Sequence, residues 1–134
     1  MTLKKLILLI LPMLVFANHG FAEKIVLANQ TGHPMNESRI GIQWATSANE
    51  VAEANKAIMY GLKLNPASFQ ILTENGKLTL NSPKKAEYFR VVVWSKGSGE
   101  PDLLTNWVDI IPDKTYELKE DYLVPAVLMI GSGC

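Results

Sequence analysis

The chain has 134 residues, with 13 basic and 13 acidic side chains and a single cysteine. This length is enough for one ordinary domain and too short for two. The charges are scattered and form no stripe of lysine or arginine, which argues against nucleic acid and anionic membrane surfaces as partners. One cysteine excludes an internal disulfide, so we expect a disulfide-free domain that is stabilised by packing alone.

Residues 1–22 have the organisation of a secretory signal peptide. Two early lysines are followed by an apolar run over residues 6–16, and Gly20 and Ala22 then place small residues before a cleavage point. The apolar run is shorter than the about 20 residues that a membrane-spanning helix needs. We therefore expect cleavage after Ala22, a single β-rich domain over residues 23–134 without a membrane anchor, and a periplasmic or secreted location.

Two segments near the start of the expected domain have strand patterns. Residues 24–28 form a short apolar stretch, and residues 39–45 alternate between two faces, one of which carries two isoleucines and a tryptophan. The residues between them, 29–34, favour a turn or loop, because asparagine, glycine and proline adopt turn geometry readily. The sequence therefore predicts two strands joined by a polar loop.

A short helix is expected next. Ser47 and Glu50 have the spacing of a capping box, in which each side chain bonds the backbone amide of the other residue. The alanines that follow favour a helix over about residues 48–56. From Ile58 the apolar residues alternate again, which predicts a strand over residues 58–64.

The strongest local signal lies between Phe69 and Ser82. Asn75-Gly76 is the preferred pair for a two-residue type I′ turn, because both turn positions need a positive φ. With that turn Ile71 would pair with Leu80, and the apolar side chains of both strands would share one face. The sequence therefore predicts a β-hairpin.

The second half of the chain adds further strands. Residues 88–94 are nearly all apolar or aromatic, which is typical of a central strand covered on both faces. After a glycine-rich loop, shorter strands are expected at 107–111, 115–118 and 126–130. Together these patterns predict a mostly β domain, a small antiparallel β-sandwich or barrel of about seven or eight strands with one short helix.

The sequence contains no recognisable motif for catalysis, a metal or a cofactor. The expected mature chain has one histidine and one cysteine, His33 and Cys134, which are too few ligands for an ordinary zinc site. We interpret His33 as a solvated loop residue. Seven carboxylates between residues 100 and 121 lack calcium-loop spacing and fit a solvated sheet face. We expect a protein that is not an enzyme and needs no cofactor or metal; a hydrolase using these carboxylates is the least favoured alternative.

The three tryptophans fall on three separate expected strands. Trp44 shares its face with two isoleucines and is assigned to the core. Trp94 and Trp107 are candidate aromatic anchors, which could hold a partner protein or stack on a sugar. A core position for all three is the favoured alternative, because tryptophan side chains are usually buried.

The terminal segment Gly131-Ser132-Gly133-Cys134 carries the only thiol. An odd cysteine in an oxidising compartment favours an intermolecular disulfide, so Cys134 is a candidate for homodimer formation. The expected strand at 126–130 could also pair with another chain at a sheet edge. The sequence thus predicts an exported, non-enzymatic binding or assembly module that acts through protein–protein contacts in the envelope or extracellular space. The alternative is a carbohydrate-binding β-sandwich that uses an exposed tryptophan.

Overall fold

The computed structural model describes residues 21–35, 37–61, 69–97 and 99–128. Residues 1–20 of the expected signal peptide and the terminal Cys134 lie outside these residues, whereas the last two residues of that peptide, 21 and 22, are part of strand β1. Within them the chain forms nine strands, one α-helix and a short 3₁₀ helix, and residues 126–128 are also helical. In chain order the elements are β1 (Phe21–Asn29), β2 (Arg39–Ala45), α2 (Ala48–Met59), β3 (Phe69–Leu72), β4 (Gly76–Pro83), β5 (Tyr88–Trp94), β6 (Leu103–Leu104), β7 (Val108–Asp109), β8 (Thr115–Leu118), η2 (Glu120–Tyr122) and β9 (Val124–Pro125).

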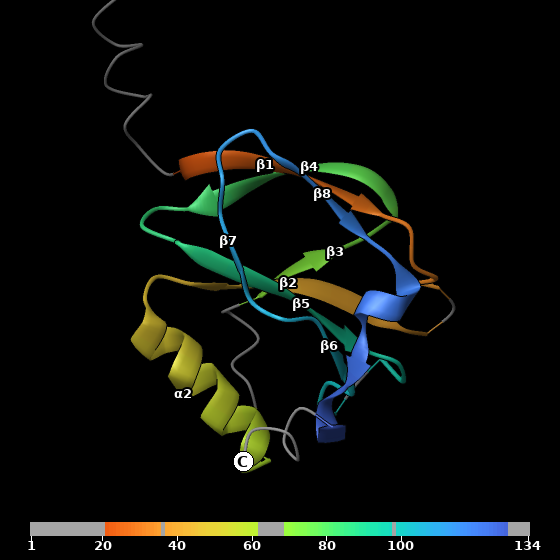
Figure 1. The fold of residues 1–134 in the computed structure, drawn as a ribbon. Helices are drawn as coiled ribbons and strands as arrows, with labels where there is room; N and C mark the ends of the chain where they lie inside the picture. The colour runs from red at the N-terminus through yellow and green to blue at the C-terminus, as the bar shows by residue number, and fades with distance from the viewer. Residues whose placement is uncertain (1–20, 36, 62–68, 98, 129–134) are drawn as a thin grey trace, which may run out of the picture.

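The strands form two sheets that pack face to face (Figure 1). The smaller sheet has the order β4-β1-β8, and the larger one has the order β3-β2-β5-β6-β9, with β7 also paired to β5. The expected mostly β sandwich is confirmed, and the described strands do not close into a barrel. The described residues hold nine strands where seven or eight were expected, and three of them, β6, β7 and β9, are only two residues long.

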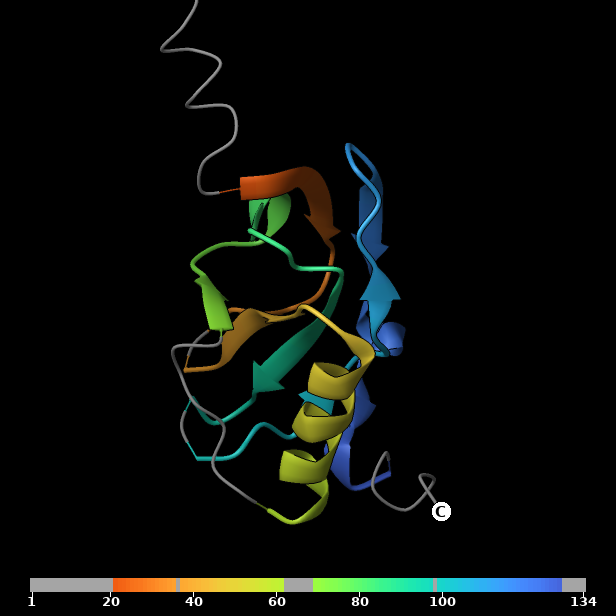
Figure 2. The same cartoon turned by 90° about the vertical axis from the view of Figure 1, so that its left-hand side faces the viewer.

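Helix α2 lies on the side of the larger sheet that faces away from the smaller sheet, as Figures 1 and 2 show. The segment from β6 to β8 runs along one side of the molecule in Figure 2 and joins the two layers, because β7 pairs with β5 and β8 pairs with β1. The larger sheet therefore has an inner face toward the smaller sheet and an outer face toward α2.

The main core fills the space between the sheets. Buried side chains enter it from both sheets: Ile25, Leu27, Leu80 and Leu118 from the smaller one, and Ile40, Ile42, Leu72, Phe89, Val91 and Val93 from the larger one. Because side chains alternate along a strand, Arg90, Val92 and Trp94 of β5 lie on the outer face. A second, smaller apolar cluster forms there around Val92, so β5 is covered on both faces as expected.

Helix α2 begins as predicted. The Ser47 hydroxyl accepts a hydrogen bond from the Glu50 amide at 3.2 Å. The Glu50 carboxylate bonds the Thr46 amide instead of the expected Ser47 amide, at 2.9 Å. The helix continues to Met59 and is followed by a turn at residues 60–61, so the expected strand over 58–64 is wrong for residues 58–61; residues 62–64 lie outside the described residues.

The hairpin expected around Asn75-Gly76 is wrong. Strand β3 pairs with β2 in the larger sheet, whereas β4 pairs with β1 in the smaller sheet. Of the two turn residues only Gly76 has a positive φ, 91°. Leu72 is buried and Ile71 is exposed, and Leu72 and Leu80 enter the core from opposite sheets. Burying both leucines in one core outweighs the local turn preference.

Two further features differ from the expected antiparallel arrangement. Strands β1 and β8 pair in parallel, from Val26 with Thr115 to Asn29 with Leu118. The expected strand over 126–130 is replaced by the two-residue β9 and a helical segment at 126–128; residues 129–130 lie outside the described chain. Pro125 has no amide hydrogen to donate, so it limits β9 to a short edge strand.

Candidate binding site

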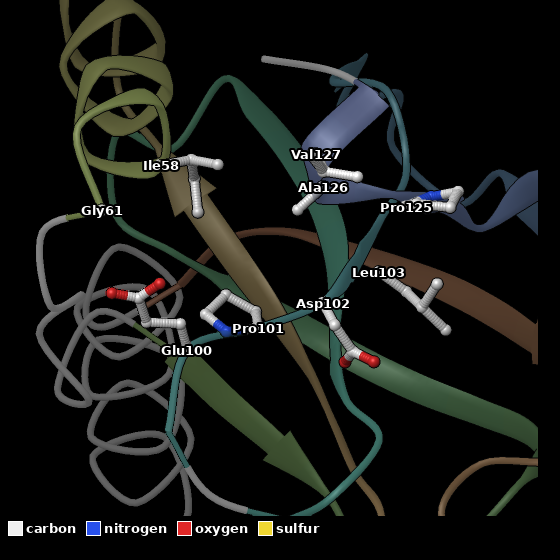
Figure 3. A pocket seen from close by; sticks show the side chains of 9 residues that line it. All are labelled: Ile58, Gly61, Glu100, Pro101, Asp102, Leu103, Pro125, Ala126 and Val127. Carbon is white, nitrogen blue, oxygen red and sulfur yellow. The ribbon is translucent and has the colours of Figure 1, made fainter. Parts of the chain in front are cut away.

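A cavity of about 500 Å³ opens beside the C-terminal end of α2 (Figure 3). Its walls come from the end of α2, from residues 100–103 and from residues 125–127. In Figure 3, Ile58 lies on one side of the cavity and Ala126 and Val127 on the other, with Pro101 below and between them. Three segments that are distant in the sequence therefore meet around one apolar space.

Asp102 connects two of these segments, residues 100–103 and 125–127, to strand β5. Its backbone amide donates to the Val93 carbonyl at 3.0 Å, and its carbonyl accepts from the Ala126 amide at 2.8 Å. Its carboxylate accepts a hydrogen bond from the Ser95 amide at 2.8 Å. Burial raises the pKa of Asp102, but the hydrogen bonds from Ser95 outweigh this effect and bring the pKa below its usual value. The carboxylate therefore stays ionised and holds the loop between β5 and β6.

The cavity is bordered by exposed apolar side chains. Val127, which lines the cavity, is 70% exposed, and the residue that follows it in the sequence, Leu128, is 60% exposed. The lining residues include the carboxylates Glu100 and Asp102 and no lysine or arginine. An open cavity that combines exposed apolar side chains with a few polar groups is typical of an interaction site.

A buried charge lies under α2 on the same outer face. Arg90 is 1% exposed, and its Nε donates to Gln43 Oε1 at 2.7 Å while its Nη1 donates to Asn55 Oδ1 at 3.1 Å. Its Nη2 is buried and has no hydrogen-bond partner among the described residues. Burial lowers the pKa of Arg90 to about 10, so the guanidinium remains charged at neutral pH.

Trp107 lies directly against this charge. The guanidinium carbon of Arg90 is 4.5 Å from the centre of the Trp107 ring, within the range of a cation–π contact. The indole Nε1 donates to Asn55 Oδ1 at 3.1 Å. The candidate anchor Trp107 is thus partly buried, and one face of its ring is covered by Arg90.

The other two tryptophans have separate surroundings. Trp94 packs edge to face on Phe69, with ring centres 5.2 Å apart, and contributes to the cluster around Val92. Trp44 packs against Phe89 at the edge of the main core, with ring centres 5.9 Å apart. The structure places Trp94 and Trp107 on the same outer face, but no ring contact joins them within the described residues.

His33 is less solvated than its loop position suggested, with a side chain that is 17% exposed. Its Nδ1 lies 3.0 Å from the Ser38 hydroxyl, and its Nε2 lies 3.6 Å from a carboxylate oxygen of Glu120. The other oxygen of Glu120 accepts the Gly32 amide, so this group of side chains connects the loop after β1 to η2. No three His, Cys, Asp or Glu side chains in the described ranges are grouped so that they could hold a metal ion.

Sequence reasoning missed Arg90, Asn55 and the cavity. The signal for Arg90 was the single charged residue in the middle of the apolar run 88–94. Of the helices in the described part of the chain, none is both long and apolar enough to cross a membrane.

No protein-family model matches the chain, and neither the curated proteins nor the solved structures contain a match to it. What the outer face can bind must therefore be inferred from its own shape, charge and hydrogen bonding.

Proposed function

We propose that the chain is a non-enzymatic binding module that holds an apolar segment of another protein in the cavity beside α2. The main observation in support of this proposal is the open cavity of about 500 Å³, which is lined in part by the exposed side chain of Val127. Keeping apolar side chains of this size in water is costly, and a partner that covers them recovers about 25 cal/mol for each Å² of apolar surface.

The negative charge at the cavity favours a partner segment that carries lysine or arginine in addition to its apolar residues. Glu100 and Asp102 are the charged residues in the lining, and the Asp102 carboxylate is already engaged by Ser95. Glu100 is exposed and available to a basic group of the partner. Charge complementarity at the rim of an interface favours fast and selective association.

The carbohydrate-binding alternative has weaker support. A sugar-stacking platform needs a free aromatic face, and one face of Trp107 is covered by the Arg90 guanidinium. Trp94 packs with Phe69 in the outer cluster. Tryptophan fluorescence across a panel of glycans tests this alternative, since a stacked sugar would change the emission.

We further propose that the module works in the envelope or outside the cell. The support is the order of charged, apolar and small residues in the first 22 positions. The intact mass of the natural protein tests this proposal: a chain that begins at Glu23 supports export, and a chain that keeps Met1 contradicts it.

Site-specific photo-cross-linking in the native cell tests the proposed binding site. A photoreactive residue at Val127 is expected to capture a distinct protein, while the same residue at Lys77, exposed on β4 of the other sheet, is expected not to capture it. With the captured protein purified, Val127→Asp should weaken binding at least about tenfold, because it places a charge in an apolar contact. Equal capture from both positions, or unchanged affinity of the variant, would contradict the proposal.

A further inference from the structure

Two N–H donors from separate parts of the chain converge on one oxygen atom under α2. Arg90 Nη1 and Trp107 Nε1 each donate to Asn55 Oδ1, both at 3.1 Å. Asn55 itself is exposed on the helix, although the guanidinium that it covers is buried. The acceptor that both donors share therefore belongs to an exposed side chain.

The positive charge at this point lacks a negative partner. Among the described residues no Asp or Glu forms an ion pair with Arg90, which is bonded to two neutral amides, and its Nη2 has no acceptor. A buried charge is normally paired with an opposite charge, because an unpaired one costs several kcal/mol. A group that complements this site carries one negative charge and oxygen acceptors.

We propose that Arg90 and Trp107 form a receptor for a carboxylate group, which binds in place of the Asn55 side chain. One carboxylate oxygen accepts from Trp107 Nε1 and Arg90 Nη1, and the other accepts from Arg90 Nη2. A planar carboxylate suits the guanidinium fork, and charge-assisted bonds of this kind are about twice as strong as neutral ones. The carboxylate comes from a small organic acid or from an acidic side chain of a partner protein. This inference does not depend on the cavity beside α2.

The experiment is a titration of acetate into the ¹⁵N-labelled protein at constant ionic strength. The indole N–H resonance of Trp107, assigned with Trp107→Phe, reports on the site. We expect a saturable shift in the wild type and several-fold tighter binding in Asn55→Ala, which removes the competing oxygen. Inorganic phosphate is expected to bind more weakly than acetate, since one guanidinium matches a single charge.

Asn55→Asp provides the sharpest comparison. It places a carboxylate on the helix where the ligand would bind, so it should abolish the acetate response and raise the melting temperature by about 5 °C. Asn49→Asp adds the same charge at another exposed position of α2 and should leave the acetate response unchanged. Both asparagines are exposed, so these variants are expected to fold.

Three results would overturn the proposal: no acetate shift in either the wild type or Asn55→Ala, an undiminished shift in Asn55→Asp, or an equal shift in folded Arg90→Gln. A shift with phosphate that equals the shift with acetate would also overturn the carboxylate assignment. A blocked peptide with one glutamate, compared with its glutamine counterpart and with succinate, identifies the source. Tighter binding of the glutamate peptide than of succinate assigns the site to a partner protein, and the reverse order assigns it to a small acid.

Discussion

The guanidinium of Arg90 stacks on the ring of Trp107, and both side chains donate a hydrogen bond to the same oxygen of Asn55. The stacking places the charge on the electron-rich face of the indole, which offsets part of the cost of burial. The larger sheet thus carries a buried charge that no acidic side chain of the described residues balances. Substitutions of Arg90 can therefore measure what this buried charge contributes to the free energy of unfolding.

We expect Arg90→Ala to lower the free energy of unfolding by about 3 kcal/mol. The substitution leaves a void beside Trp107 and removes the donor to the buried Gln43 amide oxygen. The double variant Arg90→Met, Gln43→Leu should lie within about 1 kcal/mol of the wild type, because both polar partners are replaced by apolar groups of similar size. Urea unfolding at pH 7 measures both values. A double variant as unstable as Arg90→Ala would contradict this account.

The two described glycines of the loop between β5 and β6 should differ in their tolerance of alanine. Gly97 and Gly99 both have φ of 80°, where a side chain is strained by about 1 kcal/mol. A Cβ at Gly99 meets open space, whereas a Cβ at Gly97 would overlap the carbonyl oxygen of Glu37. Thermal unfolding should therefore show Gly97→Ala to be about 2 kcal/mol less stable than Gly99→Ala. Equal losses of stability in the two variants would contradict this prediction, because they would mean that the Gly97 loop and the backbone of Glu37 can move apart freely.

Acid should weaken the start of α2. The hydrogen bond from the Thr46 amide holds the pKa of Glu50 below its usual value. Its stabilising effect is therefore complete above the unfolded-state pKa, about 4.3, and is lost as the pH falls through the folded-state pKa. Glu50→Gln should lower stability by about 0.5 kcal/mol at pH 7 and by less at pH 3. Glu53→Gln on the same helix is the control, and a loss for Glu50→Gln that is independent of pH would refute the mechanism.

The stability of the segment between β6 and β7 should depend on the hydroxyl group of Thr105. Thr105 Oγ1 accepts the Val91 amide at 2.8 Å, and the Thr105 amide donates to the Val91 carbonyl at 3.0 Å, so Thr105 continues the pairing of β5 where the two short strands are interrupted. Thr105→Val keeps the shape but leaves the Val91 amide without an acceptor, which should cost about 2 kcal/mol. Thr105→Ser keeps the oxygen and should cost less than about 1 kcal/mol. Urea denaturation measures the free energy of unfolding of both variants. A larger loss for Thr105→Ser than for Thr105→Val would contradict this role of the Thr105 hydroxyl group.

The terminal thiol remains a candidate for covalent dimer formation, although Cys134 lies outside the described residues. We expect a dimer band for the natural protein on a non-reducing gel that disappears on reduction, because an unpaired thiol in an oxidising compartment is readily oxidised. Cys134→Ser should give a monomer band under both conditions. Identical mobility of the wild type with and without reductant would contradict the hypothesis.

Elements whose signal is local could be predicted from the sequence. Strands β2 and β8 have the expected bounds, and α2 starts at the expected cap, because side-chain alternation and the Ser47 hydroxyl act within a few residues. The central position of β5 also followed from its apolar composition. These features need no knowledge of what lies on the other side of the core.

Pairing between distant segments could not be predicted in this way. Asn75-Gly76 has the chemistry of a hairpin turn, but Leu72 and Leu80 are buried from opposite sheets, which requires the chain to cross between the layers. The contacts on the outer face of the larger sheet could not be predicted for the same reason. Trp107 could be selected as a candidate by its residue type, whereas its link to Asn55 and Arg90 depends on three segments that meet only in the folded chain.

The parallel pairing of β1 with β8 has a consequence for synthesis. Strand β1 is the middle strand of the smaller sheet, yet its second neighbour, β8, is completed only at Leu118. Such non-local contacts slow folding, because a long loop has to close before they form. An emerging chain therefore cannot finish this sheet until the segment up to Leu118 is free to fold. A product that ends before Thr115 would expose the backbone edge of Val26–Asn29, which can template aggregation.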